Sequence, residues 1–107
     1  METLEKGKAF VPNEVIDYAR GGIVSKEFIR SRGGSVTLFA FDEGQQLSEH
    51  QAPFDAVLNI IDGEMELTVN GTLHRLHSGE MFVIPADAPH TVNAVKPFKM
   101  MITMIRG

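Results

Sequence analysis

The stretch MELTVNGTLHRL, residues 65–76, decides the fold class, because two alternating segments flank Asn70-Gly71. Both central residues tolerate positive φ, so we predict a β-hairpin with a two-residue type I′ turn. That turn determines the register of the two strands. On the apolar face we expect the pairs Val69–Thr72, Leu67–His74 and Met65–Leu76, and on the other face Thr68–Leu73 and Glu66–Arg75. The apolar face should point to the interior or to a partner, and Glu66 and Arg75 should form an exposed ion pair.

Short runs of apolar, β-branched and aromatic residues continue on both sides of this hairpin. We expect further strands at residues 23–29, 36–41, 54–61, 64–69, 81–84, 91–95 and 98–105, with a turn at 30–35 around Gly33-Gly34. No segment has the length and period of a full amphipathic helix. The spacing therefore predicts an all-β sandwich or barrel over residues 21–107. Residues 1–20 are interpreted as a lead-in, in which Pro12 starts a helical turn that continues through Tyr18.

The composition limits the class of function. The 107 residues suit one domain with a single core, and 43% hydrophobic and 22% charged residues are typical of a globular protein. The net charge of −4 argues against nucleic acid or a membrane surface as the main partner, because binding phosphates needs a basic face. The chain has no cysteine, which excludes disulfides and thiolate metal sites. No run approaches the roughly 20 apolar residues of a membrane span, and the N-terminal METLEK lacks the apolar stretch of a signal peptide, so we expect a cytoplasmic protein.

Several predicted strands are apolar on both faces. In residues 98–105 one face carries Phe98, Met100, Ile102 and Met104, and Met101 and Ile105 interrupt the other face. A sheet with one face in water alternates more cleanly than this. We therefore expect a second layer and a homodimer interface that together cover the second faces.

Two of the four histidines stand at regular distances from glycine and proline. Gly44 precedes His50 by six positions and Gly63 follows it by thirteen, while the stretch GEMFVIPADAPH, residues 79–90, ends in His90. These two frames resemble the two sequence motifs of the cupin family, in which a glycine, five residues and a histidine are followed by a second frame of glycine, proline and histidine. The resemblance covers residues 36–107 and implies an antiparallel jelly-roll barrel of about six to eleven strands.

The metal-binding positions that the resemblance implies are only half filled. In metal-binding cupins two histidines and a glutamate of the first motif and the histidine of the second hold the ion. Here His50 and His90 match, but Ala52 stands at the second histidine and Ala56 at the glutamate, and Asp87 replaces a motif glycine. Catalytic metal sites generally keep three protein ligands. The alternatives are a site without metal and a weakly bound divalent ion such as Zn, Mn, Fe or Ni.

Strand parity places the motif positions around one pocket. Residues 50, 52 and 56 share parity, so on a regular strand their side chains point to the same face. The expected pocket residues are His50, His90, Ala52, Ala56 and Gln46, the last from the loop before His50. Asp55 has the opposite parity and should point away unless a bulge turns it inward. His74 is expected to be half-buried and satisfied by a neighbour, and His77 to be solvated.

Three functions are compatible with these residues. The first is a small-molecule binding protein in which His50 and His90 are the polar anchors of an apolar cavity. The second is an enzyme of the dioxygenase, isomerase or epimerase type that the resemblance implies, acting through a metal or through a metal-free acid/base pair. The third is a structural or regulatory module, since a fold does not determine a function.

Overall fold

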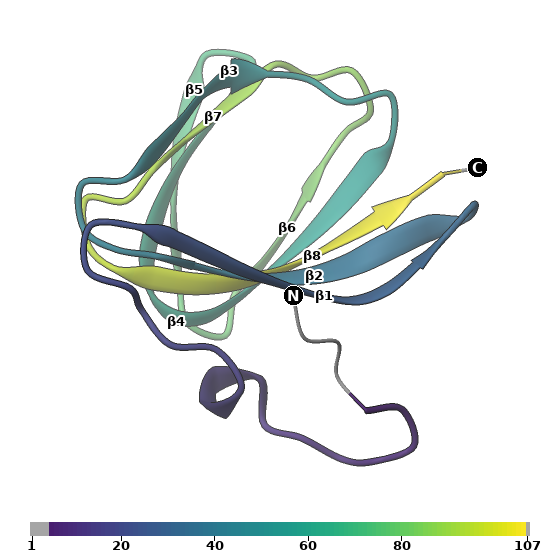
Figure 1. The fold of residues 1–107 in the computed structure, drawn as a ribbon. Coiled ribbons are helices and arrows are strands. Elements are labelled where there is room, and N and C mark those ends of the chain that lie inside the picture. The colour runs from purple at the N-terminus through teal and green to yellow at the C-terminus, as the bar shows by residue number, and fades with distance from the viewer. Residues whose placement is uncertain (1–4, 107) are drawn as a thin grey trace.

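The computed structural model describes residues 5–106 and consists almost entirely of antiparallel strands (Figure 1). Residues 1–4 of the predicted lead-in, and Gly107, lie outside this range. A short 3-10 turn, η1 (Pro12–Glu14), precedes the strands β1 (Ile23–Ser31), β2 (Gly34–Phe41), β3 (Gln46–His50), β4 (Asp55–Val69), β5 (Thr72–His77), β6 (Met81–Ile84), β7 (His90–Asn93) and β8 (Phe98–Ile105). The prediction of an all-β antiparallel fold is confirmed. No helix in the described range is long and apolar enough to cross a membrane.

The long strand β4 belongs to two sheets. Its first part pairs with β8 and β6, which places it in a sheet of order β1-β2-β8-β4-β6, here called sheet A. Its second part pairs with β5 and β7, and β7 continues to β3, which gives sheet B. The two sheets curl around a common interior (Figure 1). The expectation of two separate strands at 54–61 and 64–69 is wrong, because β4 runs through both segments. Gly63, with a φ of +75°, and a register shift between Ile60 and Asp62 bend the strand without ending it.

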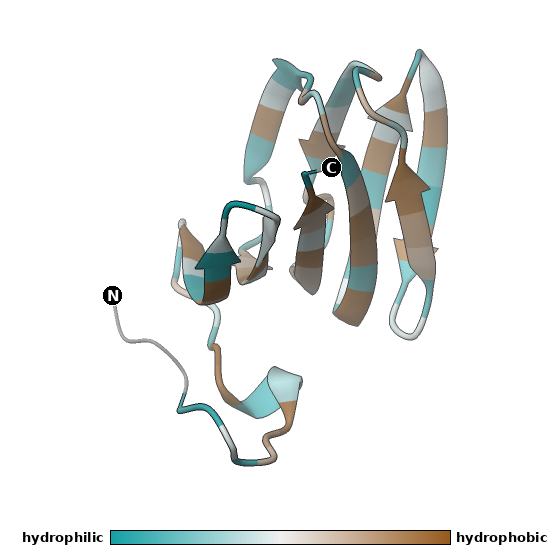
Figure 2. Cartoon of the chain, turned by 90° about the vertical axis from the view of Figure 1, so that its right-hand side faces the viewer, coloured by the Kyte–Doolittle hydropathy of each residue, from teal (hydrophilic) through white to brown (hydrophobic). Residues whose placement is uncertain are grey.

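The hairpin of residues 65–76 has the predicted register throughout. Asn70 and Gly71 both have positive φ, 50° and 81°, as a type I′ turn requires. Its apolar face lies in the core: Met65, Leu67, Val69 and Leu76 are all buried. On the outer face Arg75 Nε lies 3.2 Å from Glu66 Oε2, which is the predicted ion pair. Bands of apolar and polar residues alternate along the strands in Figure 2, as strands with one buried face require.

Strand β3 corrects one expectation from the sequence. Gln46 lies in the first position of a strand and not in a loop, and it pairs with Asn93 of β7. The stretch QLSEH carries a single apolar residue, Leu47, and all its other side chains are exposed. Hydrophobic periodicity does not detect such a strand, because β3 is stabilised by its backbone pairing with β7 and not by the burial of its side chains.

The lead-in covers part of the outer face of sheet A. Ile16, only 2% exposed, packs against Leu38 and Ala40 of β2, which are fully buried. The lead-in thus covers the outer apolar face of β2. It is the second layer that the apolar pattern of the sequence had suggested. The predicted helical turn through Tyr18 is wrong, because only Pro12–Glu14 forms a turn and the following residues run as irregular chain.

Polar contacts hold the lead-in on the sheet. Lys99, only 6% exposed, donates from Nζ to the backbone and side-chain oxygens of Asn13 at 2.9 Å each. The Tyr18 hydroxyl donates to Asp62 Oδ2 at 2.6 Å, and Lys99 Nζ lies 5.0 Å from the Tyr18 ring centroid. Burial, and then the hydrogen bond to Asp62, raise the pKa of the Tyr18 phenol well above its usual value. A buried ammonium group requires such partners, so these contacts determine where the lead-in lies.

Candidate functional site

The fold brings His50 and His90 together from residues forty positions apart in the chain. His50 ends β3, His90 begins β7, and the two are cross-strand partners. Their ring centroids lie 4.1 Å apart at an interplanar angle of 60°. His90 is buried at 9% exposure, while His50 is exposed to solvent. The pair therefore has one face toward the interior and one toward water.

Backbone hydrogen bonds set the tautomer of both rings. His50 Nδ1 lies 2.9 Å from the carbonyl oxygen of Ser48, and His90 Nδ1 lies 3.0 Å from that of Ala88. A carbonyl oxygen only accepts, so each Nδ1 carries a hydrogen, and in the neutral ring Nε2 is then the acceptor. Two neighbouring acceptors suit a group that donates hydrogen bonds, such as a hydroxyl.

The histidine pair forms the polar part of a small cavity of about 80 Å³. Ala52 and Ala56 line the same cavity. The remaining lining is apolar and consists of Phe54, Leu58, Ile84, Pro85, Ile102 and Met104. Residues 51–54 form a loop between β3 and β4. Positions 50, 52 and 56 therefore face the same cavity, but they do not lie on one regular strand as the parity argument assumed. Gln46 is exposed and is not one of the residues that line this cavity.

Asp55 has a structural contact outside the cavity. Its Oδ1 accepts a hydrogen bond from the backbone N–H of Ala86 at 2.9 Å. The next backbone N–H, that of Asp87, donates to the carbonyl oxygen of Ala52 at 2.7 Å. Asp87 has a φ of +66°, a conformation that glycine adopts most easily, which explains why the motif has glycine at this position. These two bonds tie the start of β4 and the segment before it to the segment before β7, and so hold the cavity wall.

The other two histidines lie outside the cavity. The His74 ring is half-buried and lies 4.7 Å from the Phe82 ring, centroid to centroid. His77 is exposed, as expected, but it is also paired: Nε2 lies 2.8 Å from Glu64 Oε1 and Nδ1 lies 3.1 Å from Glu80 Oε1. The backbone N–H of His77, and then its ring, lower the pKa of the Glu80 carboxyl. The β4–β5 ladder extends one pair beyond the predicted ones and places Glu64 opposite His77, whereas the Glu80 contact depends on the turn at Gly79.

The side chains at the cavity do not fit the four-ligand metal site of the cupin motifs. Two imidazoles are present, and alanine methyl groups stand at the other two ligand positions. Across residues 5–106 no three or more histidine, aspartate or glutamate side chains come together in a group that could hold an ion. Catalytic metal ions in proteins generally keep three protein ligands. With two imidazoles and two alanines, these four positions supply fewer ligands than such an ion requires.

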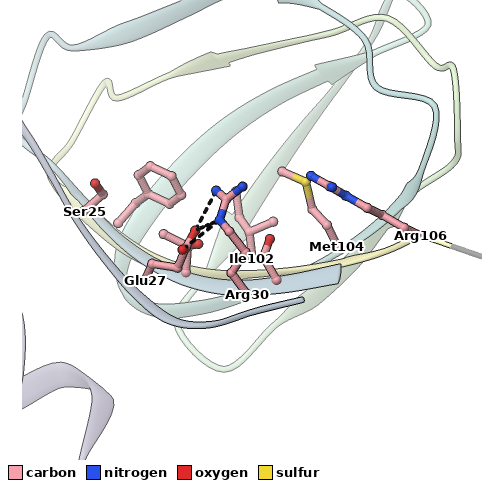
Figure 3. Close-up of a pocket in the computed structure, with 9 residues that line it drawn as sticks. Ser25, Glu27, Arg30, Ile102, Met104 and Arg106 are labelled. Carbon is pink, nitrogen blue, oxygen red and sulfur yellow. Dashed lines mark hydrogen bonds and ion pairs between the residues drawn. The ribbon is translucent and has the colours of Figure 1, made fainter. Parts of the chain in front are cut away.

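A second and larger cavity, of about 360 Å³, adjoins the first on the inner face of sheet A (Figure 3). Its polar lining comes from β1, β2 and the end of β8: Ser25, Glu27, Arg30, Ser35, Thr37 and Arg106. Its apolar lining is Phe39, Ile102 and Met104. The polar lining was not expected from the sequence. Arg106 could have been noticed, because it continues the alternation of the apolar row Phe98, Met100, Ile102 and Met104 and so points to the same face.

The comparisons with known proteins agree with this architecture. The family model described as the cupin domain matches residues 37–105. A conserved protein of unknown function from Streptococcus pyogenes has a similar structure, with a TM-score of 0.92 at 26% identity over 97% of this chain and 91% of that one. A cupin superfamily protein from Desulfitobacterium hafniense is similar at a TM-score of 0.91 and 21% identity, over 99% and 97% of the two chains.

A third similar structure has a higher sequence identity to this chain than these two. It is a cupin 2 conserved barrel domain protein from Leptotrichia buccalis, 36% identical with a TM-score of 0.85, covering 88% of this chain but only 46% of that one. No curated protein matches the sequence. These similarities establish the architecture and leave the ligand to be inferred from the cavity.

Proposed function

The chain belongs to the cupin family, and from that premise we propose that it binds a small molecule in the barrel cavity, with no metal or a weakly held one. The observation that carries the proposal is the histidine pair: two imidazoles with hydrogen-bonded Nδ1 atoms at the mouth of an otherwise apolar cavity. A few polar groups that converge in an apolar cavity are typical of ligand sites. In this arrangement the alanines enlarge the cavity, and the two Nε2 atoms orient a donor group of the ligand.

The test compares the wild type with the double variant His50→Ala/His90→Ala. The ligands screened are phenols, sugars and small hydroxy acids, and we expect some of them to raise the melting temperature of the wild type. A ligand at a hundredfold excess over its Kd stabilises the folded state by about 2.7 kcal/mol, and we expect the double variant to lose nearly all of this. Without ligand the double variant should melt at a lower temperature, because it loses the buried His90 ring and its hydrogen bond to Ala88, so the shift caused by the ligand is measured within each protein.

The variant His74→Ala/His77→Ala is the matched control, since it removes two histidines that lie outside the cavity. It should keep the stabilisation by ligand. Equal stabilisation of the wild type and the His50/His90 variant would show that the ligand binds elsewhere. Metal analysis of protein purified without a nickel column separates the alternatives: stoichiometric metal would contradict the proposal and favour a metal-dependent enzyme.

We also propose that the chain forms a homodimer through the uncovered part of the outer face of sheet A. The lead-in does not cover β6, whose Met81 and Val83 are 63% and 57% exposed. Within the described residues β6 pairs only with β4, so it is an edge strand with apolar side chains. We expect sedimentation at about twice the 11.8 kDa chain mass, and a shift to the monomer in Met81→Lys/Val83→Lys. A wild-type monomer at micromolar concentration would contradict the dimer.

A further inference from the structure

We propose that the ligand is a small organic acid whose carboxylate is held by Arg106 in the second cavity. This inference rests on the proposed function and names the ligand class of the same site. The starting observation is that the two cavities share part of their lining. Ile102 and Met104 of β8 border both of them, so a ligand that contacts these two side chains lies between the histidine pair and the polar cavity.

The second cavity carries a positive charge that the described residues do not neutralise. Arg30 is occupied, because its Nε and Nη2 atoms donate to the Glu27 carboxylate at 2.8–3.0 Å. Arg106 makes no ion pair with any carboxylate of residues 5–106; its guanidinium lies 4.8 Å from the Phe54 ring centroid. The cavity thus has one excess positive charge in a chain whose net charge is −4.

Arg106 is held at the junction of the two cavities. Its backbone N–H donates to the carbonyl oxygen of Gly33 at 2.8 Å, which attaches the end of β8 to the β1–β2 turn. Its side chain lines the second cavity and stacks on Phe54, which lines the first. A guanidinium that rests on an aromatic ring still presents its N–H edge to a planar carboxylate.

The remaining lining defines the rest of the ligand. Phe39, Ile102 and Met104 offer an apolar surface for a hydrocarbon or aromatic body. The hydroxyl groups of Ser25, Ser35 and Thr37 can donate to further oxyanion atoms. The histidine pair accepts from a donor at the other end of the ligand. The larger cavity alone, at about 360 Å³, is within the range of about 300–1,000 Å³ that is typical of small-molecule sites.

The experiment measures matched pairs of acids and amides by NMR titration. The probes are benzoate and benzamide, 4-hydroxybenzoate and 4-hydroxybenzamide, and hexanoate and hexanamide. We expect at least one acid to bind the wild type about tenfold or more tighter than its amide, because a hydrogen bond to a charged group contributes that much. Arg106→Gln should remove this preference and leave the binding of the amides unchanged.

Arg32→Gln is the control, since it removes the same charge from the exposed β1–β2 turn without touching either cavity. It should bind the acids as the wild type does. The inference is overturned if no acid is preferred over its amide, or if Arg106→Gln and Arg32→Gln have equal effects.

The His50→Ala/His90→Ala variant separates this inference from the proposed function. We expect 4-hydroxybenzoate to bind the wild type more tightly than benzoate, because its hydroxyl group can donate to the histidine pair. The double variant should abolish this difference while the preference for acids remains. If amides bind in a way that depends on the histidines and no acid is preferred, the role of Arg106 is overturned and the proposed function stands. A preference for acids that depends on Arg106, with no effect of the histidines, would overturn the histidine site alone.

Discussion

Replacing Gly63 with alanine should destabilise the fold by about 2–5 kcal/mol, the sum of a left-handed backbone and an overpacked contact. Gly63 has a φ of +75° and pairs with Phe98. A Cβ atom at this position would overlap the carbonyl oxygen of Pro97 and lie 2.9 Å from Phe98 Cα. Both neighbours are backbone atoms, which cannot rotate away. Urea unfolding followed by circular dichroism measures the change.

Gly71→Ala is the matched control for this experiment. Gly71 has a similar φ of +81°, but an added Cβ would meet nothing within 4 Å. Its loss of stability should therefore be limited to the backbone term, about 1–2 kcal/mol. Equal losses in the two variants would mean that the close approach of β4 and β8 at Gly63 does not contribute to the requirement for glycine.

The double variant Ala52→His/Ala56→Glu should acquire a strong site for a divalent metal. Positions 52 and 56 line the cavity beside His50 and His90, so the new side chains would complete a set of three imidazoles and one carboxylate. Such a set suits Zn, Mn, Fe or Ni. At a hundredfold excess of metal over the Kd of the variant, the folded state should gain about 2.7 kcal/mol, and the wild type should gain much less at the same concentration.

The comparison must be made within each protein, with and without metal. Two larger side chains enter a cavity of about 80 Å³, and overpacking costs about 1–3 kcal/mol before any metal binds. Adding His90→Ala to the double variant serves as the control and should remove most of the gain. If the double variant folds but binds metal no better than the wild type, positions 52 and 56 do not face the histidine pair as a ligand set requires.

Local signals made the hairpin and the fold class predictable from the sequence. Asn70-Gly71 determines a turn type, the turn determines the register, and every pair that follows from it is present. Strand β3 was not predictable in the same way, because its residues are polar and its pairing with β7 is long-range. The continuity of β4 was missed for a related reason: a glycine inside a strand can mark either a turn or a bend, and only the contacts with β8 decide between them.

The candidate site was predictable to the extent that it follows motif spacing. Spacing singled out His50 and His90, and the fold places them as cross-strand partners. It could not reveal the bonds from Nδ1 to Ser48 and Ala88, which depend on local backbone geometry. It also could not reveal the contact between Arg106 and Phe54, which joins residues more than fifty positions apart, although strand parity places Arg106 on the inner face.

The 15-residue strand β4 lies in both sheets, and this limits how the protein can come apart. Its ladder with β8 and its ladder with β5 share one uninterrupted backbone, so neither sheet can lose β4 without pulling on the other. Partial unfolding is then confined to elements that β4 does not pair, chiefly the edge strands β1 and β3 and the lead-in. His90 lies in β7, which β4 pairs, whereas His50 lies in the edge strand β3, so the histidine pair can open at β3 while the rest of the barrel stays folded.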